Sequence, residues 1–311
     1  MITQSQNGVP SVHQKNEELA NTLVRLKEMK LVDIVEGDPN LFTAVLLAGI
    51  ARRDLCISTS LPIARAVERI GSLVCRSCVV IQCSRSSTWK SIASQLRSDQ
   101  LTIFQDLSVL PPDVQSVVLE ALVRRRFKLE GQFHDLYRFI AVAIISPHSW
   151  PALTRYFRDH FLLSHRQESE PAVVESPTGM RIDLVQAFIA STTERIPRMV
   201  VSVDIKRYMQ DLVVFLRTHR LVRKGVSPRA VQDFDFLVRA LSVLHGYDFV
   251  TPSIVVIAAR KVFPLRLEMC EVTDEPSISY GGDIKLLRQW MKKWDQELIV
   301  EDVLSSVAPP I

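Results

Sequence analysis

Residues 101–126 read LTIFQDLSVLPPDVQSVVLEALVRRR, and they join a strand-like run to a helical one. The first six residues, LTIFQD, are mostly apolar and β-forming, which predicts a buried strand over 101–106. Pro111-Pro112 suits the first turn of the following helix, because proline fixes its backbone angle and no hydrogen-bond donor is needed there. The apolar side chains predicted to share one face of this helix are Val114, Val117, Val118 and Leu122.

The same alternation of short apolar strands and helices extends on both sides of this stretch. Further strands are predicted over 55–58 (LCIS), 77–84 (SCVVIQCS) and 139–146 (FIAVAIIS). Further helices are predicted over 41–51, over 61–74 with Pro62 in the first turn, and over 151–161. Strands that are apolar throughout are buried on both faces, which is typical of a parallel sheet covered by helices. We therefore predict an α/β core over residues 38–165.

The rest of the chain divides around this core. Residues 1–37 form a polar leader with an amphipathic helix expected over 15–35, and residues 166–180 are polar, acidic and Pro-containing, as an exposed linker is. Residues 181–270 are helical in pattern almost throughout, which predicts a small all-α domain. Residues 271–311 form a tail whose last helix carries Trp290 and Trp294.

Composition indicates a globular protein. The chain has 311 residues, 47% of them hydrophobic and 23% charged, and a net charge of +4. Its N-terminus lacks the apolar stretch of a secretory signal, and its apolar runs are shorter than the ~20 residues that cross a bilayer. Five cysteines, an odd number, favour reduced buried thiols. We expect an intracellular protein, cytoplasmic or nuclear, with no membrane contact.

Two stretches resemble the AAA+ ATPases, in the branch that contains MoxR proteins and the ATPase subunit of magnesium chelatase. Over 101–163 the order is similar to that branch's Walker B strand, Pro-led helix, hairpin turn at Gly131, sensor-1 strand and closing helix. Over 225–267 the turn Ser227-Pro228-Arg229 and the helix start Val250-Thr251-Pro252 resemble its lid domain. The resemblance implies an AAA+-like parallel sheet with flanking helices plus a small all-α lid, assembled into a homo- or hetero-oligomer with AAA+ or related subunits.

The phosphate-binding loop of such a site is missing from the sequence. Binding a nucleoside triphosphate needs backbone N–H groups around the phosphates, a Lys on them and a Ser or Thr on Mg²⁺, written G-x-x-x-x-G-K-[ST]. Residues 55–65 read LCISTSLPIAR, with neither Gly nor Lys, and no Gly-Lys dipeptide occurs in the chain. Side chains on every loop residue oppose the close approach that glycine permits.

The other positions of the motif set have also changed. The resemblance places Gln105-Asp106 at the Walker B pair, with Asp106 as the candidate catalytic acid, and Ser146 at the sensor-1 Asn. A neutral amide such as that of Gln105 is a poor ligand for Mg²⁺, which prefers carboxylate oxygen. Arg229 matches the sensor-2 Arg of the lid. These matches make Gln105, Ser146 and Arg229 the candidate nucleotide contacts.

The resemblance also points to a subunit interface. His160 matches the Arg of the closing triplet, and with the neighbouring Arg158 it is the candidate for contact with another subunit. Simpler roles stay open for two of the site residues. Arg229 is also compatible with an ion pair near a helix N-terminus, and Asp106 with a helix cap or turn.

Three functions remain in view. The first is an assembly or scaffold subunit with a degenerate nucleotide site and no cofactor. The second is an active magnesium chelatase-like ATPase, which would use ATP and Mg²⁺. The third is nucleic-acid binding through the basic stretch Arg217, Arg220, Arg223 and Lys224.

Other sites have little support in the sequence. Cys75-x-x-Cys78 with Cys83 lacks a second pair of ligands at zinc-finger spacing, and no resident metal is predicted. Arg124-Arg125-Arg126 is predicted to be a solvated helix end, where cations complement the helix dipole.

Overall fold

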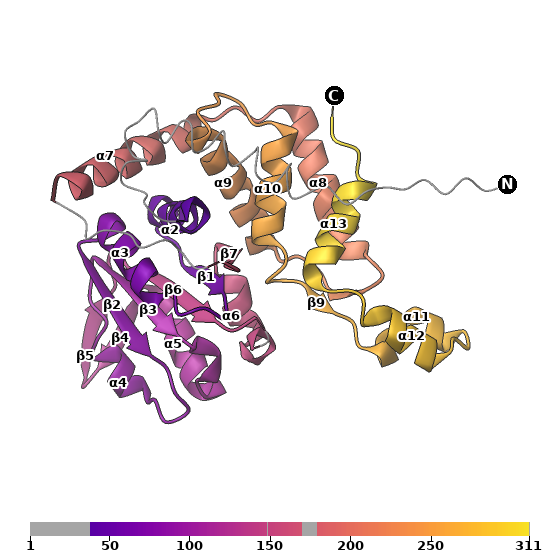
Figure 1. Ribbon diagram of the computed structural model, residues 1–311, viewed down its shortest axis with the longest axis horizontal. Helices are drawn as coiled ribbons and strands as arrows, with labels where there is room; N and C mark the ends of the chain where they lie inside the picture. Colours follow the sequence, from indigo (N-terminus) through magenta and orange to yellow (C-terminus); the bar gives the residue numbers. More distant parts are fainter. Residues whose placement is uncertain (1–37, 148, 170–178, 311) are drawn as a thin grey trace.

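The computed structural model describes residues 38–147, 149–169 and 179–310 (Figure 1). The helix predicted over 15–35 lies outside these residues. A five-stranded sheet forms the centre of the core, in the order β2-β3-β6-β1-β7, and every neighbouring pair is parallel. Its strands are β1 (Leu55–Ser58), β2 (Ser77–Gln82), β3 (Gln100–Gln105), β6 (Ile140–Ile145) and β7 (Leu163–Arg166).

The sheet is covered on both faces, because alternate residues of its strands enter two separate clusters. Leu55 and Ile57 of β1 face the cluster that contains α2 (Pro39–Ala51) and α3 (Ala64–Val74), whereas Cys56 faces the other cluster. That second cluster holds side chains of the remaining core helices. These are α4 (Trp89–Ala93), α5 (Pro112–Arg124) and α6 (Arg155–His160).

A two-stranded hairpin interrupts the core between α5 and β6. It consists of β4 (Arg126–Leu129) and β5 (Gln132–Asp135), joined through Glu130 and Gly131. Both turn residues have a positive φ, 50° for Glu130 and 89° for Gly131, a conformation that glycine adopts without strain. The hairpin turn predicted at Gly131 is therefore present.

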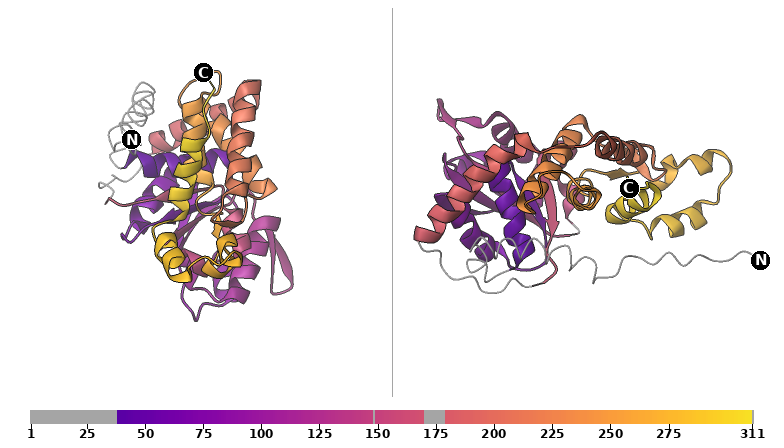
Figure 2. Two further views of the ribbon diagram at one scale, coloured as in Figure 1. Left: turned by 90° about the vertical axis from the view of Figure 1, so that its right-hand side faces the viewer. Right: turned by 90° about the horizontal axis from the view of Figure 1, so that it is seen from above.

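The second half of the chain is helical. α7 (Gly179–Arg195) packs on α2 and α3, and it also contacts the helical domain through α9. α13 packs against α8 and α10, so the C-terminal tail belongs to the helical domain (Figures 1 and 2). The main helices of this domain are α8 (Val203–Thr218), α9 (Pro228–Leu244), α10 (Pro252–Val262) and α13 (Gln296–Ser306).

Smaller elements complete the structure. β8 (Val222–Lys224) and β9 (Glu268–Met269) form a short antiparallel pair, and α11 (Pro276–Ser279) and α12 (Ile284–Met291) precede α13. The short 3₁₀ turns are η2 (Leu107–Val109), η3 (Trp150–Ala152), η4 (Ile196–Arg198) and η5 (Val272–Asp274).

The predicted α/β core with a parallel sheet, followed by helices, is confirmed. Three details differ. β7 lies at the sheet edge where no strand was predicted, because three of the four residues in its sequence LSHR are polar. On α5, Val117 is 38% exposed, whereas the polar residue Gln115 is buried. The Gln115 amide donates hydrogen bonds to the carbonyls of Leu110 and Ala152.

The third detail concerns the two tail tryptophans. Trp290 lies on α12, which ends at Met291, so Trp294 lies beyond that helix rather than one turn along it. Their rings still contact each other, with centroids 5.8 Å apart. Within the described residues, none of the helices has the length and apolarity that a membrane span requires.

Candidate functional site

The loop that follows β1, residues 59–63, occupies the place where a phosphate-binding loop would lie. It leaves the carboxyl end of β1, which lies between β6 and β7, at the edge of the sheet where open α/β sheets usually bind ligands. Three of its four N–H groups donate within the protein. Thr59 N donates to Ile145 O at 2.9 Å, Leu61 N to the Thr59 hydroxyl at 3.0 Å, and Ile63 N to Leu61 O at 2.9 Å.

The remaining loop residues also disfavour a phosphate. Pro62 has no N–H, and the Ile63 side chain, 1% exposed, fills the start of α3 as part of the hydrophobic core. Gly71 on α3 serves packing, because a Cβ there would lie 3.0 Å from Cys78 Sγ. The residues of this loop therefore do not fit the triphosphate of Mg-ATP, and no step through ATP is derived from them.

Gln105, Asp106 and Ser146 meet at the same edge of the sheet. Asp106 N donates to Ile144 O at 2.9 Å, and its backbone is left-handed, with φ 59°. Its carboxylate accepts from Gln82 Nε2 at 3.2 Å. Ser146 O accepts both from Ser149 N at 3.0 Å and from the Ser149 hydroxyl at 2.9 Å. The two predicted positions Asp106 and Ser146 thus hold the turns that leave β3 and β6.

The remaining predicted residues lie at the opposite edge. Arg229 Nη2 donates to the backbone carbonyl of His160 at 3.2 Å, and the His160 ring contacts Asp54, the residue before β1. Four strand residues separate Asp54 from the loop, roughly 13 Å at 3.3 Å per residue. Arg229 and the loop after β1 are therefore at opposite ends of β1, and the structure does not bring the predicted nucleotide contacts into one site.

Of the two residues predicted for a subunit interface, His160 is bonded to Asp54 within the chain and Arg158 is half-buried. The His160 side chain is 3% exposed. Arg158 is half-buried, burial lowers its pKa from the usual value, and its Nε has no hydrogen-bond partner among the described residues. The interface role of these two residues stays a prediction.

Asp54 is the centre of a buried polar cluster that the sequence did not predict. Its carboxylate accepts from Arg125 at 3.1 and 3.2 Å, from Ala141 N at 2.8 Å and from His160 Nε2 at 2.5 Å. Burial alone would raise the pKa of Asp54, but Arg125 and the His160 hydrogen bond outweigh it and lower that pKa to about 2. Since an ionised carboxylate only accepts, His160 Nε2 carries the hydrogen.

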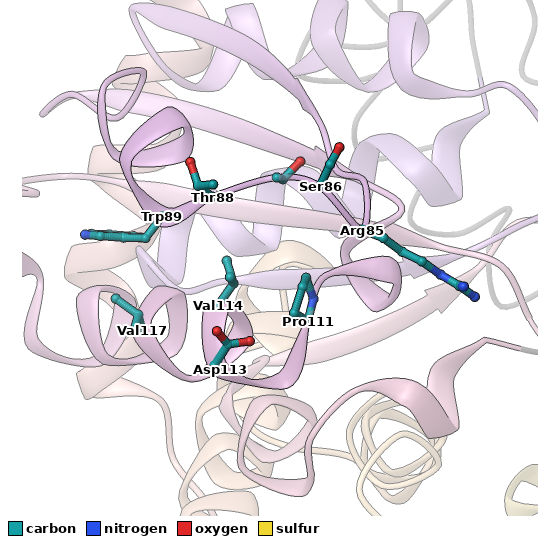
Figure 3. Close-up of a pocket in the computed structure, with 9 residues that line it drawn as sticks. Arg85, Ser86, Thr88, Trp89, Pro111, Asp113, Val114 and Val117 are labelled. Atoms are coloured by element: carbon teal, nitrogen blue, oxygen red, sulfur yellow. The ribbon is translucent and has the colours of Figure 1, made fainter.

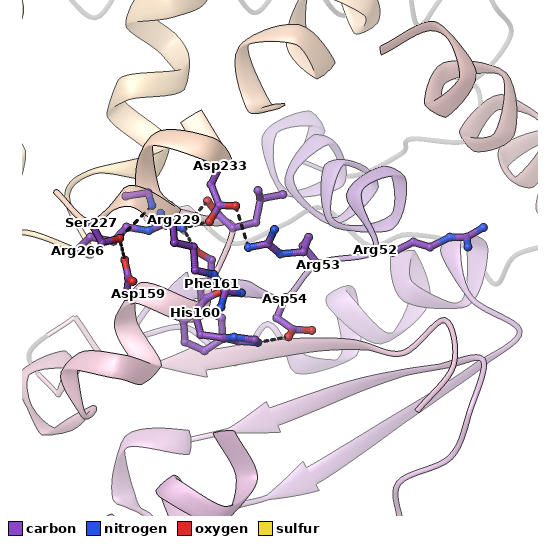
Figure 4. Close-up of polar contacts among 12 residues, drawn as sticks. Arg52, Arg53, Asp54, Asp159, His160, Phe161, Ser227, Arg229, Asp233 and Arg266 are labelled. Carbon is purple, nitrogen blue, oxygen red and sulfur yellow. Dashed lines mark hydrogen bonds and ion pairs between the residues drawn. The ribbon is translucent and has the colours of Figure 1, made fainter. Parts of the chain in front are cut away.

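Asp233 makes a second charged contact, between the core and the helical domain (Figure 4). This α9 residue is 1% exposed, and it pairs with Arg53 of the core at 2.8 Å and with the buried Arg266 at 2.5 Å. Arg266 also donates to the carbonyls of Phe161 and Leu162 in the core.

Ser227 adds a further bond between the two domains. Its hydroxyl donates to Asp159 Oδ1 at 2.6 Å and accepts from Ala230 N at the start of α9. Burial and the nearby Arg53 charge lower the pKa of Arg229. We call Asp159, Ser227, Arg229, Asp233, Arg53 and Arg266 the interdomain clamp.

In the sequence, Arg53, Asp54 and Arg125 are marked only by their charge. The triplet Arg52-Arg53-Asp54 directly follows the helix predicted over 41–51. Arg125 was predicted to be solvated. Its left-handed backbone, φ 51°, instead turns the chain at the end of α5 and lets the guanidinium reach Asp54.

A surface hollow lies between the segment before α4 and the start of α5 (Figure 3). It is bounded by the residues before α4, among them Arg85 and Ser86, and by the first turns of α5, among them Asp113. None of the six predicted site residues lines it.

The described residues also fail to provide a metal site. Over 38–147, 149–169 and 179–310, no three His, Cys, Asp or Glu side chains gather in a way that could hold a metal ion. Burial raises the pKa of Cys75, Cys78 and Cys83 to about 12, so these thiols stay protonated.

Three of the four cations of the basic stretch on the helical domain, Arg220, Arg223 and Lys224, pair with acids of β9 and of the segment that follows it. Arg220 pairs with Glu275, and Arg223 lies 3.5 Å from Asp274. Lys224 lies 3.8 Å from Glu268. These ion pairs reduce the charge available to a phosphate backbone, which disfavours the nucleic-acid surface predicted there.

Comparisons with known proteins give the chain relatives over part of its length. No family model matches it. Maintenance of telomere capping protein 2 of Saccharomyces cerevisiae is 32% identical over 128 residues, which cover 34% of this chain and 36% of the relative. The protein of that name from Kluyveromyces lactis is 33% identical over 97 residues, or 30% and 35% of the two chains. The chain thus matches about a third of the length of these relatives.

The fold has a nearly full-length match among solved structures. A candidate ATPase from Cytophaga hutchinsonii superposes over 96% of this chain and 99% of its own, with a TM-score of 0.67 and 13% sequence identity. Together with the strand order, this likeness shows an AAA+ ATPase fold, as the resemblance implied.

Proposed function

We propose that this chain is an AAA+-type assembly or scaffold subunit that works without binding or hydrolysing ATP. The observation that carries the proposal is the loop 59–63. Three of its four backbone N–H groups already donate to Ile145, Thr59 and Leu61, and it supplies neither a lysine for phosphates nor glycine for close approach. Phosphoryl transfer depends on positioning and charge, so these losses remove the means of catalysis.

The interdomain clamp supports the same proposal. A lid that closes on ATP needs differential contacts between its open and closed states. Here the contacts between core and helical domain are ion pairs and hydrogen bonds within the chain, centred on Asp233, Arg53 and Arg266. They hold the two domains together through side chains of the chain itself, which suits a rigid scaffold.

The finer assignment to the MoxR and magnesium chelatase branch is part of the proposal. Two features support it. The strand, Pro-led helix, hairpin and strand follow one another as β3, α5, β4-β5 and β6. In the helical domain, Ser227 caps α9 with Pro228 in its first turn, and α10 begins at Pro252 after Thr251.

Nucleotide titration tests the proposal directly. Calorimetry of the full chain with ATP, with and without Mg²⁺, should give no binding heat up to millimolar nucleotide, and no phosphate should be released. The matched variant Asp106→Ala should behave as the parent does. Micromolar binding with turnover that Asp106→Ala abolishes would overturn the proposal in favour of an active ATPase.

The yeast relatives suggest a setting for this scaffold. Their name concerns the maintenance of telomere capping, and we propose that this chain acts in the same process, in the nucleus and in an oligomer with related subunits. Expression in yeast that lack the relative tests this. Full-length chain and Asp106→Ala should restore capping equally, and failure of both to do so would count against the shared process.

A further inference from the structure

The hairpin β4-β5 has one face packed on the core and one face open. Register pairs Phe127 with His134, and their rings stack 5.2 Å apart. Phe127 also meets Trp89 edge-on at 5.6 Å. Since side chains alternate along a strand, the neighbouring pairs point the opposite way, toward solvent. Those outer residues are Arg126, Lys128, Phe133 and Asp135.

The outer face carries an aromatic ring between cations. Phe133 is 66% exposed, with Arg126 5.4 Å and Lys128 5.8 Å from its ring centroid. At the base of the hairpin Tyr137 is 62% exposed, and Arg138 lies 5.4 Å from its ring. Leaving two aromatic rings in water forfeits the gain from their burial, so a ligand that covers them is favoured.

The base of the hairpin is held in place. Ser98 donates to Asp135 O at 2.7 Å and accepts from Tyr137 N at 3.2 Å. Asp99 N donates to Tyr137 O at 2.7 Å. The two exposed rings are therefore presented by a fixed backbone at the side of the core that lies away from α12 (Figures 1 and 2).

Two of the hairpin's cations are available to an anion. Arg126 is paired with Asp135 at 2.6 Å. Lys128 and Arg138, in contrast, have no carboxylate within ion-pair distance among the residues that the structure describes. The cations of the helical domain differ in this respect, because Arg220, Arg223 and Lys224 each lie within ion-pair distance of a carboxylate.

We propose that this hairpin face binds single-stranded nucleic acid, with bases stacked on Phe133 and Tyr137 and phosphates near Lys128 and Arg138. Aromatic rings beside cations are the elements from which single-strand binding surfaces are built. A protein interface would instead need an apolar centre within a polar rim. Each ring here is flanked by cations rather than by other apolar side chains. The proposal does not depend on the loss of ATP binding.

Fluorescence anisotropy with a labelled 20-nucleotide oligothymidylate tests this face. The full chain at low salt should bind it, and Phe133→Ala should weaken binding about tenfold, since one stacked base is lost. Lys128→Ala should lower the slope of log affinity against log salt. The matched control is Tyr280→Ala, a 90% exposed aromatic outside the hairpin, which should leave affinity unchanged.

A second variant keeps the test decisive if Phe133→Ala proves unstable. Phe133→Trp should bind at least as tightly as the parent, and the oligonucleotide should quench the new tryptophan. The proposal is overturned if the parent does not bind the oligonucleotide at low salt. It is also overturned if Phe133→Ala binds as tightly as the parent and the control Tyr280→Ala do. Equal competition by a polyglutamate peptide or by duplex DNA of the same length would also overturn it, since neither offers free bases.

Discussion

Asp54 and His160 lie 106 positions apart in the chain, and a hydrogen bond of 2.5 Å joins their buried side chains. The backbone carbonyl of the same histidine accepts from Arg229 of the helical domain. His160 thus links the start of β1 to the end of α6 with its ring and reaches the second domain with its main chain. His160 therefore contributes both to the buried cluster of the core and to the contact between the core and the helical domain.

Replacing Asp54 should be strongly destabilising. Asp54→Asn removes the negative charge that compensates the half-buried Arg125, and breaking a buried pair in this way costs about 3–5 kcal/mol. Urea unfolding followed by circular dichroism measures the loss. Asp211→Asn, an exposed position on α8, should change the free energy of unfolding by less than about 0.5 kcal/mol. Equal effects of the two variants would show that the Asp54 cluster adds nothing to the free energy of unfolding.

Asp54 should also set an acid limit. Its pKa is about 2 in the folded protein and near 3.8 when unfolded, so the unfolded chain binds the proton first. Its stabilisation is full above pH 4 and is lost as pH falls toward 2. A chain with Asp54→Asn should lack that component of the pH dependence between 4 and 2.

His165 gives a separate, milder pH window. This buried β7 histidine donates from Nε2 to Gln167 Oε1 at 2.8 Å, and its Nδ1 lies 3.3 Å from Lys261 Nζ on α10. Burial and the Lys261 charge lower its pKa from 6.5 to about 4. Between those values the unfolded chain takes up a proton that the folded chain refuses. Stability should therefore fall by about 3 kcal/mol as pH drops from 6.5 to 4.

The measurement is the free energy of unfolding in urea at several pH values. His165→Gln cannot titrate, so its stability should change less over pH 6.5 to 4 than that of the parent. His134→Gln, on the exposed strand β5, should keep the parent's slope. A parent curve that is flat across this window would contradict the role of His165.

Much of the fold was predictable because its strands are buried on both faces. LCIS at 55–58 and FIAVAIIS at 139–146 contain almost no polar residue, so their burial needs no tertiary information. β7 was missed because LSHR pairs only on one side, with β1, and uses Ser164 and His165 for contacts with Lys261. Its polar residues have meaning only once α10 lies beside them.

The candidate site was less predictable, since it depends on which edge of the sheet each residue reaches. Motif order placed Arg229 with Gln105 and Ser146. Only the fold shows that Arg229 is held by the His160 carbonyl at the amino end of β1. Arg125 is hidden from sequence analysis for a similar reason, because its partner Asp54 is 71 positions away.

The interdomain clamp should be measurable as a coupling energy. Arg53→Ala and Asp233→Asn each remove one side of a 2.8 Å ion pair between the domains. In a double-mutant cycle the coupling should be about 1 kcal/mol or more, because Asp233 is buried. Limited proteolysis should cleave the Asp233→Asn chain faster. The control is a double-mutant cycle on Arg239 and Asp235, which form an ion pair within α9. Its coupling energy should be near 0.5 kcal/mol.

The loop after β1 should behave as a packed core segment rather than as a ligand-binding loop. Ile63 is 1% exposed within the cluster of α2 and α3, so Ile63→Ala should cost about 2–4 kcal/mol by leaving a cavity. Ser60→Ala, at an exposed loop position, should cost less than about 0.5 kcal/mol.

Thermal unfolding with and without millimolar Mg-ATP completes the test. A ligand that binds only the folded state raises its stability, so an unchanged melting temperature in parent and Ser60→Ala is the expected result. A rise of several degrees in the parent, or an Ile63→Ala chain as stable as Ser60→Ala, would contradict a loop whose place is filled by its own side chains.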